Sequence, residues 1–298
     1  MRIVECVDLT KTMIGRNALD KLSLTIEADK ITGLIGRNGA GKTTLMKILA
    51  GYWRETSGKV EVFSERPFNN LLVSANSIYI DDLMSFSHNH NLTLEEILKE
   101  AERAYPNWDG VFAERLFDYF SFHPKSKHDA LSKGKKSTFN VIIGLASRCK
   151  LTMFDEPTTG MDASVRKDFY RALLKDYIAH PRSIIISSHH LEEIEDLLED
   201  IVLIDNGKLF FHESMDELKE YAQGITGRTE ILLPLLAKEE VIYQTQVGEN
   251  SIYAVVKTDS LVVEKAKQFG MPTGAVAPND LCIYLTAKEK GGIDDVFK

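Results

Sequence analysis

The chain contains 298 residues, of which 44% are apolar and 27% charged, and its formal net charge is −8. This ordinary globular composition leaves room for one large domain and one small domain. The acidic balance argues against a broad nucleic-acid-binding surface, which needs concentrated basic side chains, so we expect no nucleic-acid partner. Apolar runs such as Ile184–Ile186 are too short to cross a bilayer, and Glu5 interrupts any secretory leader. We therefore expect contact with a membrane only through a partner that crosses it.

Three cysteines are scattered along the chain, at Cys6, Cys149 and Cys282, without a CxxC pair or a metal-binding spacing. Such usage fits a reduced compartment. We expect all three to be small, buried apolar side chains.

The N-terminal segments alternate in hydrophobicity as strands do, over Arg2–Leu9, Leu22–Ile26 and Ile31–Ile35. The last of them runs into a glycine-rich turn and then into a helix predicted at Thr43–Ala50. This order of strand, loop and helix is the context that a phosphate-binding loop requires.

The segment near residues 92–122 predicts helices. Thr93 and Glu96 have the spacing of a capping box at the start of an apolar helical pattern. After Pro106, further apolar side chains fall on one helical face, at Val111, Phe112, Leu116, Phe117 and Phe120. We interpret residues of about 88–140 as a helical subdomain whose aromatic face belongs to the core and does not bind a ligand.

From Ser137 onward, helices alternate with apolar strands. A helix leads to the strand Leu151–Phe154, the helix Val165–Ala179 follows, and then comes the strand Ile184–Ser187. A further helix is expected after His189. This alternation predicts a mostly parallel, buried core sheet.

The pattern changes beyond Gly227 to short segments that predict strands. These segments are Glu230–Leu236, Val241–Val247 and Ser251–Lys257, and a helix is expected near Leu261–Phe269. We therefore expect a first domain over residues 1–227 and a small C-terminal α+β domain over residues 228–298.

The segment Gly36–Thr43 matches the GxxxxGK[ST] pattern in full. Its glycines allow backbone conformations in which successive N–H groups converge on phosphate oxygens, and the following helix adds its positive end. Lys42 supplies a point charge for the outer phosphates, and the Thr43 hydroxyl is suited to Mg²⁺. The predicted nucleotide-binding residues of this loop are Gly36, Arg37, Asn38, Gly39, Ala40, Gly41, Lys42, Thr43 and Thr44.

Two adjacent acids, Asp155 and Glu156, directly follow an apolar strand. Ligands gather at the carboxyl ends of strands in open α/β sheets, so both acids should face the phosphate loop. We expect Asp155 to hold Mg²⁺ and Glu156 to polarise the attacking water. The alternative, two surface acids at a turn, does not require an apolar strand before them.

The segment Leu131–Lys135 precedes a long predicted helix, which Ser132 could simply cap. However, Lys133, Lys135 and Lys136 crowd the positive end of this helix, where cations are mildly unfavourable. This crowding is better explained if an anion binds there.

In order, the chain contains GRNGAGKT, LSKGK, LTMFDEPTTGMD and IIISSHH. This layout resembles the nucleotide-binding domains of ABC transporters over about residues 1–225. The resemblance implies a P-loop NTPase fold of the α/β class, with a mostly parallel core sheet, an antiparallel β subdomain, a helical subdomain and a C-terminal appendage. The stretch Ala104–Asp109 and the LSKGK segment are most similar to bacterial ABC-2 type exporter ATPases, such as those of phenol-soluble-modulin and antimicrobial-peptide exporters.

The resemblance also implies that two such domains close head to tail around two ATP molecules with Mg²⁺. Ser132 and Gly134 of one domain would then contact the γ-phosphate that Lys42 of the other domain holds. Asp162 would communicate across this dimer, and a second ATPase subunit, identical or different, is an expected partner.

Within each site, the resemblance implies that Glu156 is the catalytic base and that His189 contacts the γ-phosphate. Lys42 completes the predicted catalytic set. Met13 stands where the family has an aromatic side chain against adenine, and Asp82 stands where it has a glutamine near the metal. We expect Met13 to contact the nucleotide and Asp82 to be a Mg²⁺ ligand. LSKGK lacks the family's usual final glutamine.

His88 and His90, near Asp82, suggest a separate metal site only weakly, because the three or four spaced ligands of such sites are lacking. A polar loop that faces solvent or a partner is the favoured interpretation.

We expect an ATPase that powers a membrane exporter of peptides, drugs or lipid-like cargo, attached at the cytoplasmic face of the membrane to a permease subunit. The alternative is a nucleotide-switched module that regulates a partner without transport. A P-loop GTPase or kinase would leave LSKGK and His189 unexplained. The identity of the cargo is not encoded in this chain.

Overall fold

The computed structural model describes all residues except 82–83, 85–91, 237–240 and 287–298, so Asp82, His88 and His90 lie outside the described residues. The chain forms two compact units. The first unit comprises residues 1–189 and 196–212, and the second comprises residues 190–195 and 213–298. The chain therefore enters the second unit briefly, directly after His189, before it returns to the first.

The first unit is built on a six-stranded sheet with the order β5-β6-β7-β3-β8-β9. Its strands are β3 (Ile31–Ile35), β5 (Ser77–Ile80), β6 (Leu151–Asp155), β7 (Ser183–Ser188), β8 (Asp200–Asp205) and β9 (Lys208–Ser214). The pairs from β5 to β8 are parallel. Every residue of β3, β5, β6 and β7 is buried, because layers cover both faces of the sheet. The predicted buried parallel sheet is confirmed.

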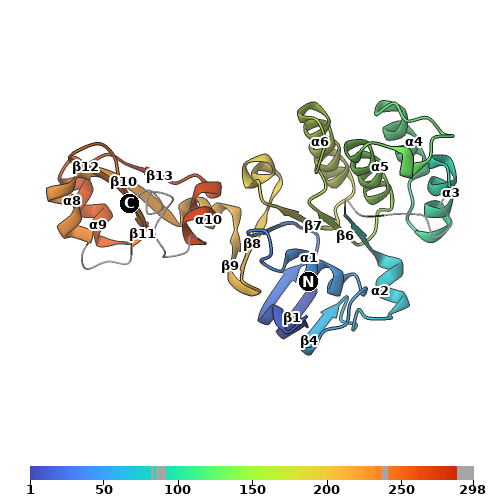
Figure 1. Ribbon diagram of the computed structural model, residues 1–298, viewed down its shortest axis with the longest axis horizontal. Helices are drawn as coiled ribbons and strands as arrows, with labels where there is room; N and C mark the ends of the chain where they lie inside the picture. The colour runs from blue at the N-terminus through green and yellow to red at the C-terminus, as the bar shows by residue number, and fades with distance from the viewer. Residues whose placement is uncertain (82–83, 85–91, 237–240, 287–298) are drawn as a thin grey trace. The chain divides into compact units, whose positions relative to one another are not determined.

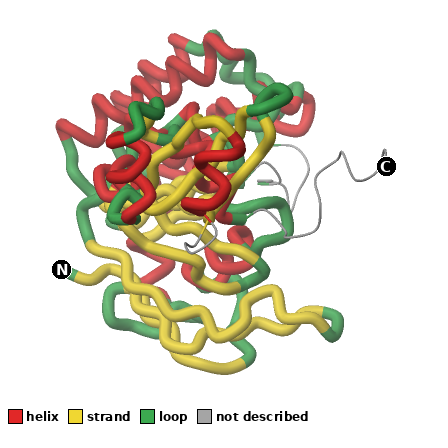
Figure 2. The backbone as a smooth tube through the Cα atoms, turned by 90° about the vertical axis from the view of Figure 1, so that its left-hand side faces the viewer, coloured by secondary structure: helices red, strands yellow, loops and turns green. Residues whose placement is uncertain are grey.

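A second, antiparallel sheet with the order β2-β1-β4 packs beside the first. It consists of β1 (Arg2–Met13), β2 (Arg16–Glu27) and β4 (Ser57–Val62), and the long strands β1 and β2 run side by side (Figure 2). Helix α1 (Lys42–Leu49) lies between the two sheets, and its Leu45 and Met46 enter the shared apolar core. The predicted antiparallel β subdomain is therefore present.

Helices α5 (Lys133–Ala146) and α6 (Ala163–Ala179) cover the opposite face of the parallel sheet (Figure 1). Helix α4 (Gly110–Tyr119) packs on α5, helix α3 (Leu94–Ala104) precedes α4 in the chain, and the short α2 (Leu71–Asn76) precedes β5. The capping box of Thr93 and Glu96 forms as predicted. Of the expected apolar face, Leu116 and Phe117 are buried, and Phe117 packs with Phe122 and Phe139. Val111, in contrast, is 60% exposed, so the face is core only in part.

The second unit has the order β-α-β-β-α-β and an antiparallel sheet with the strand order β11-β12-β10-β13, which is the split βαβ arrangement. After α7 (Met215–Glu220), its elements are β10 (Ala222–Arg228), α8 (Thr229–Leu236), β11 (Val241–Gln246), β12 (Ser251–Lys257), α9 (Leu261–Gln268), β13 (Thr273–Ala275) and α10 (Pro278–Leu285). Helices α8 and α9 pack on the sheet through one apolar cluster.

Two details of the second unit differ from the sequence prediction. The segment Glu230–Leu236, predicted as a strand, is helix α8, because Leu232 and Leu236 are one helical turn apart and both enter the core. The expected boundary at residue 227 falls inside β10, which pairs with β12 and β13, so the main segment of the second unit begins earlier, at Glu213.

Candidate active site

The phosphate loop joins the end of β3 to the start of α1. Gly36 and Gly41 have φ values of 156° and 111°, a region that side chains rarely allow. A Cβ atom at Gly36 would lie 2.3 Å from the Ile204 carbonyl oxygen, and one at Gly41 would lie 2.6 Å from the Ala18 carbonyl oxygen. The tight path of the loop therefore requires glycine at both positions.

Lys42 is the first residue of α1 and is only 6% exposed. Its ammonium group donates to the Gly36 carbonyl oxygen at 2.5 Å and lies 3.8 Å from Glu156 Oε1. Burial lowers the pKa of Lys42, while the Glu156 and Asp155 carboxylates act in the opposite direction. The loop thus directs a cation toward the acids that follow β6.

A cavity of about 300 Å³ opens above the loop. Its lining residues are Ala18, Arg37, Asn38, Gly39, Ala40, Gly41, Lys42, Thr43, Thr44, Asp155 and Glu156. The structure thus gathers most of the predicted nucleotide-binding residues around one space. Met13 does not line this cavity and lies at the end of β1, 39% exposed, next to the hairpin turn. Ala18, which the sequence did not single out, lines it instead.

Asp155 ends β6 and is buried, with a hydrogen bond to each carboxylate oxygen. The Ser187 hydroxyl on β7 donates to Oδ1 at 2.5 Å, and the Tyr79 hydroxyl on β5 donates to Oδ2 at 2.8 Å. Neither donor was apparent from the sequence, because each depends on which strands are neighbours in the sheet.

Glu156 follows Asp155 in the left-handed backbone region, with φ 48°. Its N–H donates to Ser187 Oγ at 3.0 Å, and its Oε2 lies 2.7 Å from His189 Nδ1. Its Oε1 is buried and has no hydrogen-bond partner within the described part of the chain. The predicted base and the histidine predicted to contact the γ-phosphate therefore form a pair, and the second carboxylate oxygen lies beside Lys42.

The LSKGK segment packs against the turn that follows the paired acids. A Cβ atom at Gly134 would lie 2.2 Å from the Gly160 carbonyl oxygen. The Ser137 hydroxyl donates to the Thr159 carbonyl oxygen at 2.8 Å. These contacts join the start of α5 to the loop before α6.

Ser132 is the N-cap of α5 and accepts a hydrogen bond from the Lys135 N–H at 3.4 Å, as the simpler alternative predicted. Asp162 is the N-cap residue of α6. Ser132 and Asp162 are exposed, and neither they nor Gly134 line the cavity above the phosphate loop. Within one chain, the structure therefore does not unite the two halves of the predicted shared site.

Cys6, Cys149 and Cys282 are unpaired and buried, as expected. Burial raises the pKa of Cys6 and Cys282 to about 12 and that of Cys149 to about 11. Among the described residues, no group of three or more His, Cys, Asp or Glu side chains has the arrangement of a metal site.

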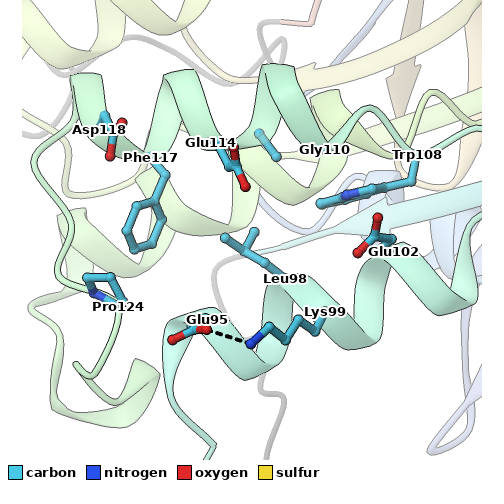
Figure 3. A pocket seen from close by; sticks show the side chains of 11 residues that line it. Glu95, Leu98, Lys99, Glu102, Trp108, Gly110, Glu114, Phe117, Asp118 and Pro124 are labelled. Carbon is cyan, nitrogen blue, oxygen red and sulfur yellow. Dashed lines mark hydrogen bonds and ion pairs between the residues drawn. The ribbon is translucent and has the colours of Figure 1, made fainter.

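A second cavity, of about 390 Å³, lies between α3 and α4 (Figure 3). Leu98, Trp108 and Phe117 give it an apolar floor. Its rim is mainly acidic and comprises Glu95, Glu102, Glu114 and Asp118, with Lys99 paired to Glu95. This groove carries a local excess of negative charge.

Comparison with known proteins decides the family. The model of the family described as "ABC transporter" matches residues 19–159. The ABC transporter ATP-binding protein YtrB of Bacillus subtilis is 31% identical over 73% of this chain and 74% of its own length. This chain belongs to the ABC transporter ATP-binding proteins.

Two further comparisons agree with this assignment. The bacitracin transport ATP-binding protein BcrA of Bacillus licheniformis is 30% identical to this ABC protein, over 73% of this chain and 72% of its own length. A dimeric ATP-binding cassette in a post-hydrolysis state, bound to ADP and Pi, superposes with a TM-score of 0.62 at 17% identity, over 72% of this chain and 99% of that one. The predicted fold class and the predicted ATPase activity in an ABC transporter are confirmed.

The described part of this ABC ATPase contains no helix of sufficient length and apolar character to cross a membrane.

Proposed function

We propose that this ABC ATPase hydrolyses ATP at sites shared between two subunits, with Glu156 as the base. The observation that carries the proposal is the arrangement around Glu156. His189 occupies Oε2 at 2.7 Å, while the buried Oε1 has no hydrogen-bond partner among the described residues and lies 3.8 Å from the Lys42 ammonium group. A water molecule on Oε1 would stand next to the cation that binds the outer phosphates.

In this mechanism the loop backbone and Lys42 bind the phosphates of ATP. Glu156 Oε1 orients the attacking water and accepts its proton, and His189 keeps the carboxylate in position through Oε2. The resemblance to ABC ATPases also implies that His189 contacts the γ-phosphate, and 45% of the His189 side chain is exposed.

The residues present fit Mg²⁺. Thr43 and Asp155 line the same cavity, and Mg²⁺ typically takes one or two protein oxygens together with phosphate oxygens and waters. Mg²⁺ would neutralise charge on the β- and γ-phosphates. We include Thr43 and Asp155 in the proposed metal site, and Asp82 remains a proposed ligand outside the described residues.

A second copy or a sister ATPase supplies the rest of each site. Ser132 and Gly134 start α5, whose N-terminus attracts anions, yet they lie outside the cavity of their own chain. In a head-to-tail dimer they would reach the γ-phosphate on the partner, and Lys133 and Lys135 would add positive charge. The dimeric cassette with ADP and Pi supports this arrangement.

Complementation between two variants tests the shared site. Lys42→Ala removes the phosphate cation, and Ser132→Arg blocks the N-terminus of α5. Each variant alone is expected to be inactive, whereas a mixture should recover partial ATPase activity, because half-sites from different chains restore one intact site. If each variant retains wild-type activity, or if the mixture stays as inactive as its components, the proposal that two subunits share each site is wrong.

The proposed membrane partner is a permease subunit that holds the ATPase at the cytoplasmic face of the membrane and exports its cargo. Cytoplasmic loops of membrane proteins are rich in Lys and Arg, and the groove between α3 and α4 offers acidic side chains around an apolar floor (Figure 3). The similarity to the bacitracin transport protein supports export. Recovery of the tagged ATPase from detergent extracts without an integral-membrane protein would favour the alternative, a nucleotide-switched regulator.

A further inference from the structure

We propose that Tyr79 is a positioning residue for Mg²⁺, acting through Asp155, an inference that rests on the proposed metal site. The Tyr79 hydroxyl donates to Asp155 Oδ2 at 2.8 Å, and Tyr79 is only 4% exposed. The two residues come from adjacent parallel strands, in which Tyr79 pairs with Met153, two residues before Asp155. The contact is therefore built into the sheet.

The carboxylate of Asp155 is held from both sides by neighbouring strands. Ser187 on β7 donates to Oδ1, and Tyr79 on β5 donates to Oδ2. Ser187 also accepts the N–H of Glu156, so it serves both acids, whereas Tyr79 acts on Asp155. Two donors on opposite oxygens leave the carboxylate one orientation, in which its remaining lone pairs are available to a metal.

The ring of Tyr79 packs against Tyr52 and against Lys47 of α1. The edge of Tyr52 packs against it with centroids 5.7 Å apart and planes at 82°. The Lys47 ammonium group, on α1, lies 5.7 Å from the Tyr79 ring centroid. Helix α1 also carries Thr43. Tyr79 thus contacts both the helix that bears Thr43 and the strand that bears Asp155, the two proposed protein ligands of Mg²⁺.

A second carboxylate lies near the same phenol. Burial raises the pKa of Tyr79, Asp155 raises it further, and Asp81, two residues further along the chain, makes a smaller contribution of the same sign. Asp81 also lies 3.6 Å from Lys47 Nζ. Since the phenol stays protonated, its one proton is available as a donor, and in this structure it is directed at Asp155.

The variant Tyr79→Phe keeps the ring and removes only the donor. The Mg²⁺ concentration that half-saturates binding of a fluorescent, non-hydrolysable ATP analogue should rise about tenfold, the scale for loss of a partner of a metal ligand. Binding of the analogue in EDTA should stay within about twofold, because the phosphate loop is untouched. Tyr52→Phe is the matched control, since it removes a neighbouring hydroxyl and should leave both values unchanged.

A double-variant cycle shows whether the effect passes through Asp155. In the Asp155→Asn background, Tyr79→Phe should change the Mg²⁺ requirement no further. The proposal is wrong if the effects of the two variants on the Mg²⁺ requirement add, or if Tyr79→Phe leaves that requirement unchanged. It is also wrong if Tyr79→Phe weakens analogue binding equally in EDTA, or if the variant does not fold. Wild-type protein that does not bind the analogue at all would instead refute the proposed function.

Discussion

The two carboxylate oxygens of Glu156 have different neighbours. Glu156 is held by His189 on one oxygen and faces Lys42 with the other. Because the two side chains share one hydrogen bond, they should act as a unit, and their contributions to the rate should not add.

The variants Glu156→Gln and His189→Ala test this coupling. Glu156→Gln should lower kcat by at least about 100-fold, the usual loss of a general base. In that background, His189→Ala should lower kcat far less than it does in the wild-type protein. The control is Glu61→Gln on β4, which replaces a carboxylate paired with Lys59 and should leave kcat unchanged. Fully additive effects in steady-state ATPase assays would show that the pair does not act as a unit.

Gly134, near the start of α5, lies against the loop before α6. Gly134→Ala places a Cβ atom 2.2 Å from the Gly160 carbonyl oxygen, so the loop before α6 must move. We expect a loss of about 1–3 kcal/mol in the free energy of unfolding of the first unit and a loss of ATPase activity. Gly110→Ala is the control, because its Cβ atom meets only ordinary contacts at 3.6 Å or more. Urea unfolding followed by tryptophan fluorescence measures both variants, since Trp53 and Trp108 belong to the first unit.

At the scale of elements, the sequence predicted local features better than contacts between distant segments. The phosphate loop, β6 with its two acids, and the capping box of α3 were predictable, because each depends on residues close together in the chain. Helix α8 was mistaken for a strand, because a short apolar run has no clear period and only tertiary packing decides between helix and strand. The contacts of Tyr79 and Ala18 could not be predicted, since they depend on strand order and on how the β1–β2 hairpin lies against the phosphate loop.

Helix α8 makes a testable contribution to the second unit. Leu232 is fully buried in the core under the sheet, whereas its neighbour Leu233 is 47% exposed. Leu232→Ala should cost about 2–5 kcal/mol, and Leu233→Ala should change stability by less than about 0.5 kcal/mol. Hydrogen exchange of β12 amides, followed by mass spectrometry, reports the stability of this unit. Equal effects of the two variants would contradict the packing of Leu232 in this apolar cluster.

A buried histidine links α5 to its surroundings. His128, in a short 3₁₀ turn, lies with Nε2 2.8 Å from Asn140 Oδ1, and Asn140 donates to the Asp81 carbonyl oxygen at 3.2 Å. Burial lowers the pKa of His128, with a smaller contribution of the same sign from Lys136; Asn140 and Asp129 oppose it. The folded protein therefore favours neutral histidine.

His128 should make the stability of the first unit depend on pH. With a folded pKa below the unfolded value of about 6.5, His128 contributes stability above that pH and loses it as pH falls toward the folded pKa. The urea concentration at the midpoint of unfolding of the first unit should thus decrease when the pH is lowered from about 7.5 to about 5.5. His128→Gln should make this decrease smaller. The exposed His123→Gln is the control and should keep the wild-type slope. A wild-type slope in His128→Gln would exclude His128 as its source.

At the scale of the whole molecule, nucleotide binding and stability are linked. All the cavity-lining residues belong to the first unit, so bound Mg·ATP stabilises that unit. At a concentration 100 times its dissociation constant, the non-hydrolysable analogue should add about 2.7 kcal/mol to the unfolding free energy reported by tryptophan fluorescence. Lys42→Ala should abolish the increase, and an equal increase in that variant would place the binding elsewhere.

The path of the chain through the second unit also limits where the protein could be truncated or recombined. Residues 190–195 belong to that unit although they lie far upstream of residue 213, and their Leu191 and Ile194 are buried. A protein truncated after residue 212 would lack helix α10, against which the short 3₁₀ turn Leu191–Glu193 packs. Leu191 and Ile194 would then lose this cover. The second unit is therefore not a detachable module. Exchange by recombination would need matched changes at two separate places in the gene, one of them directly after His189.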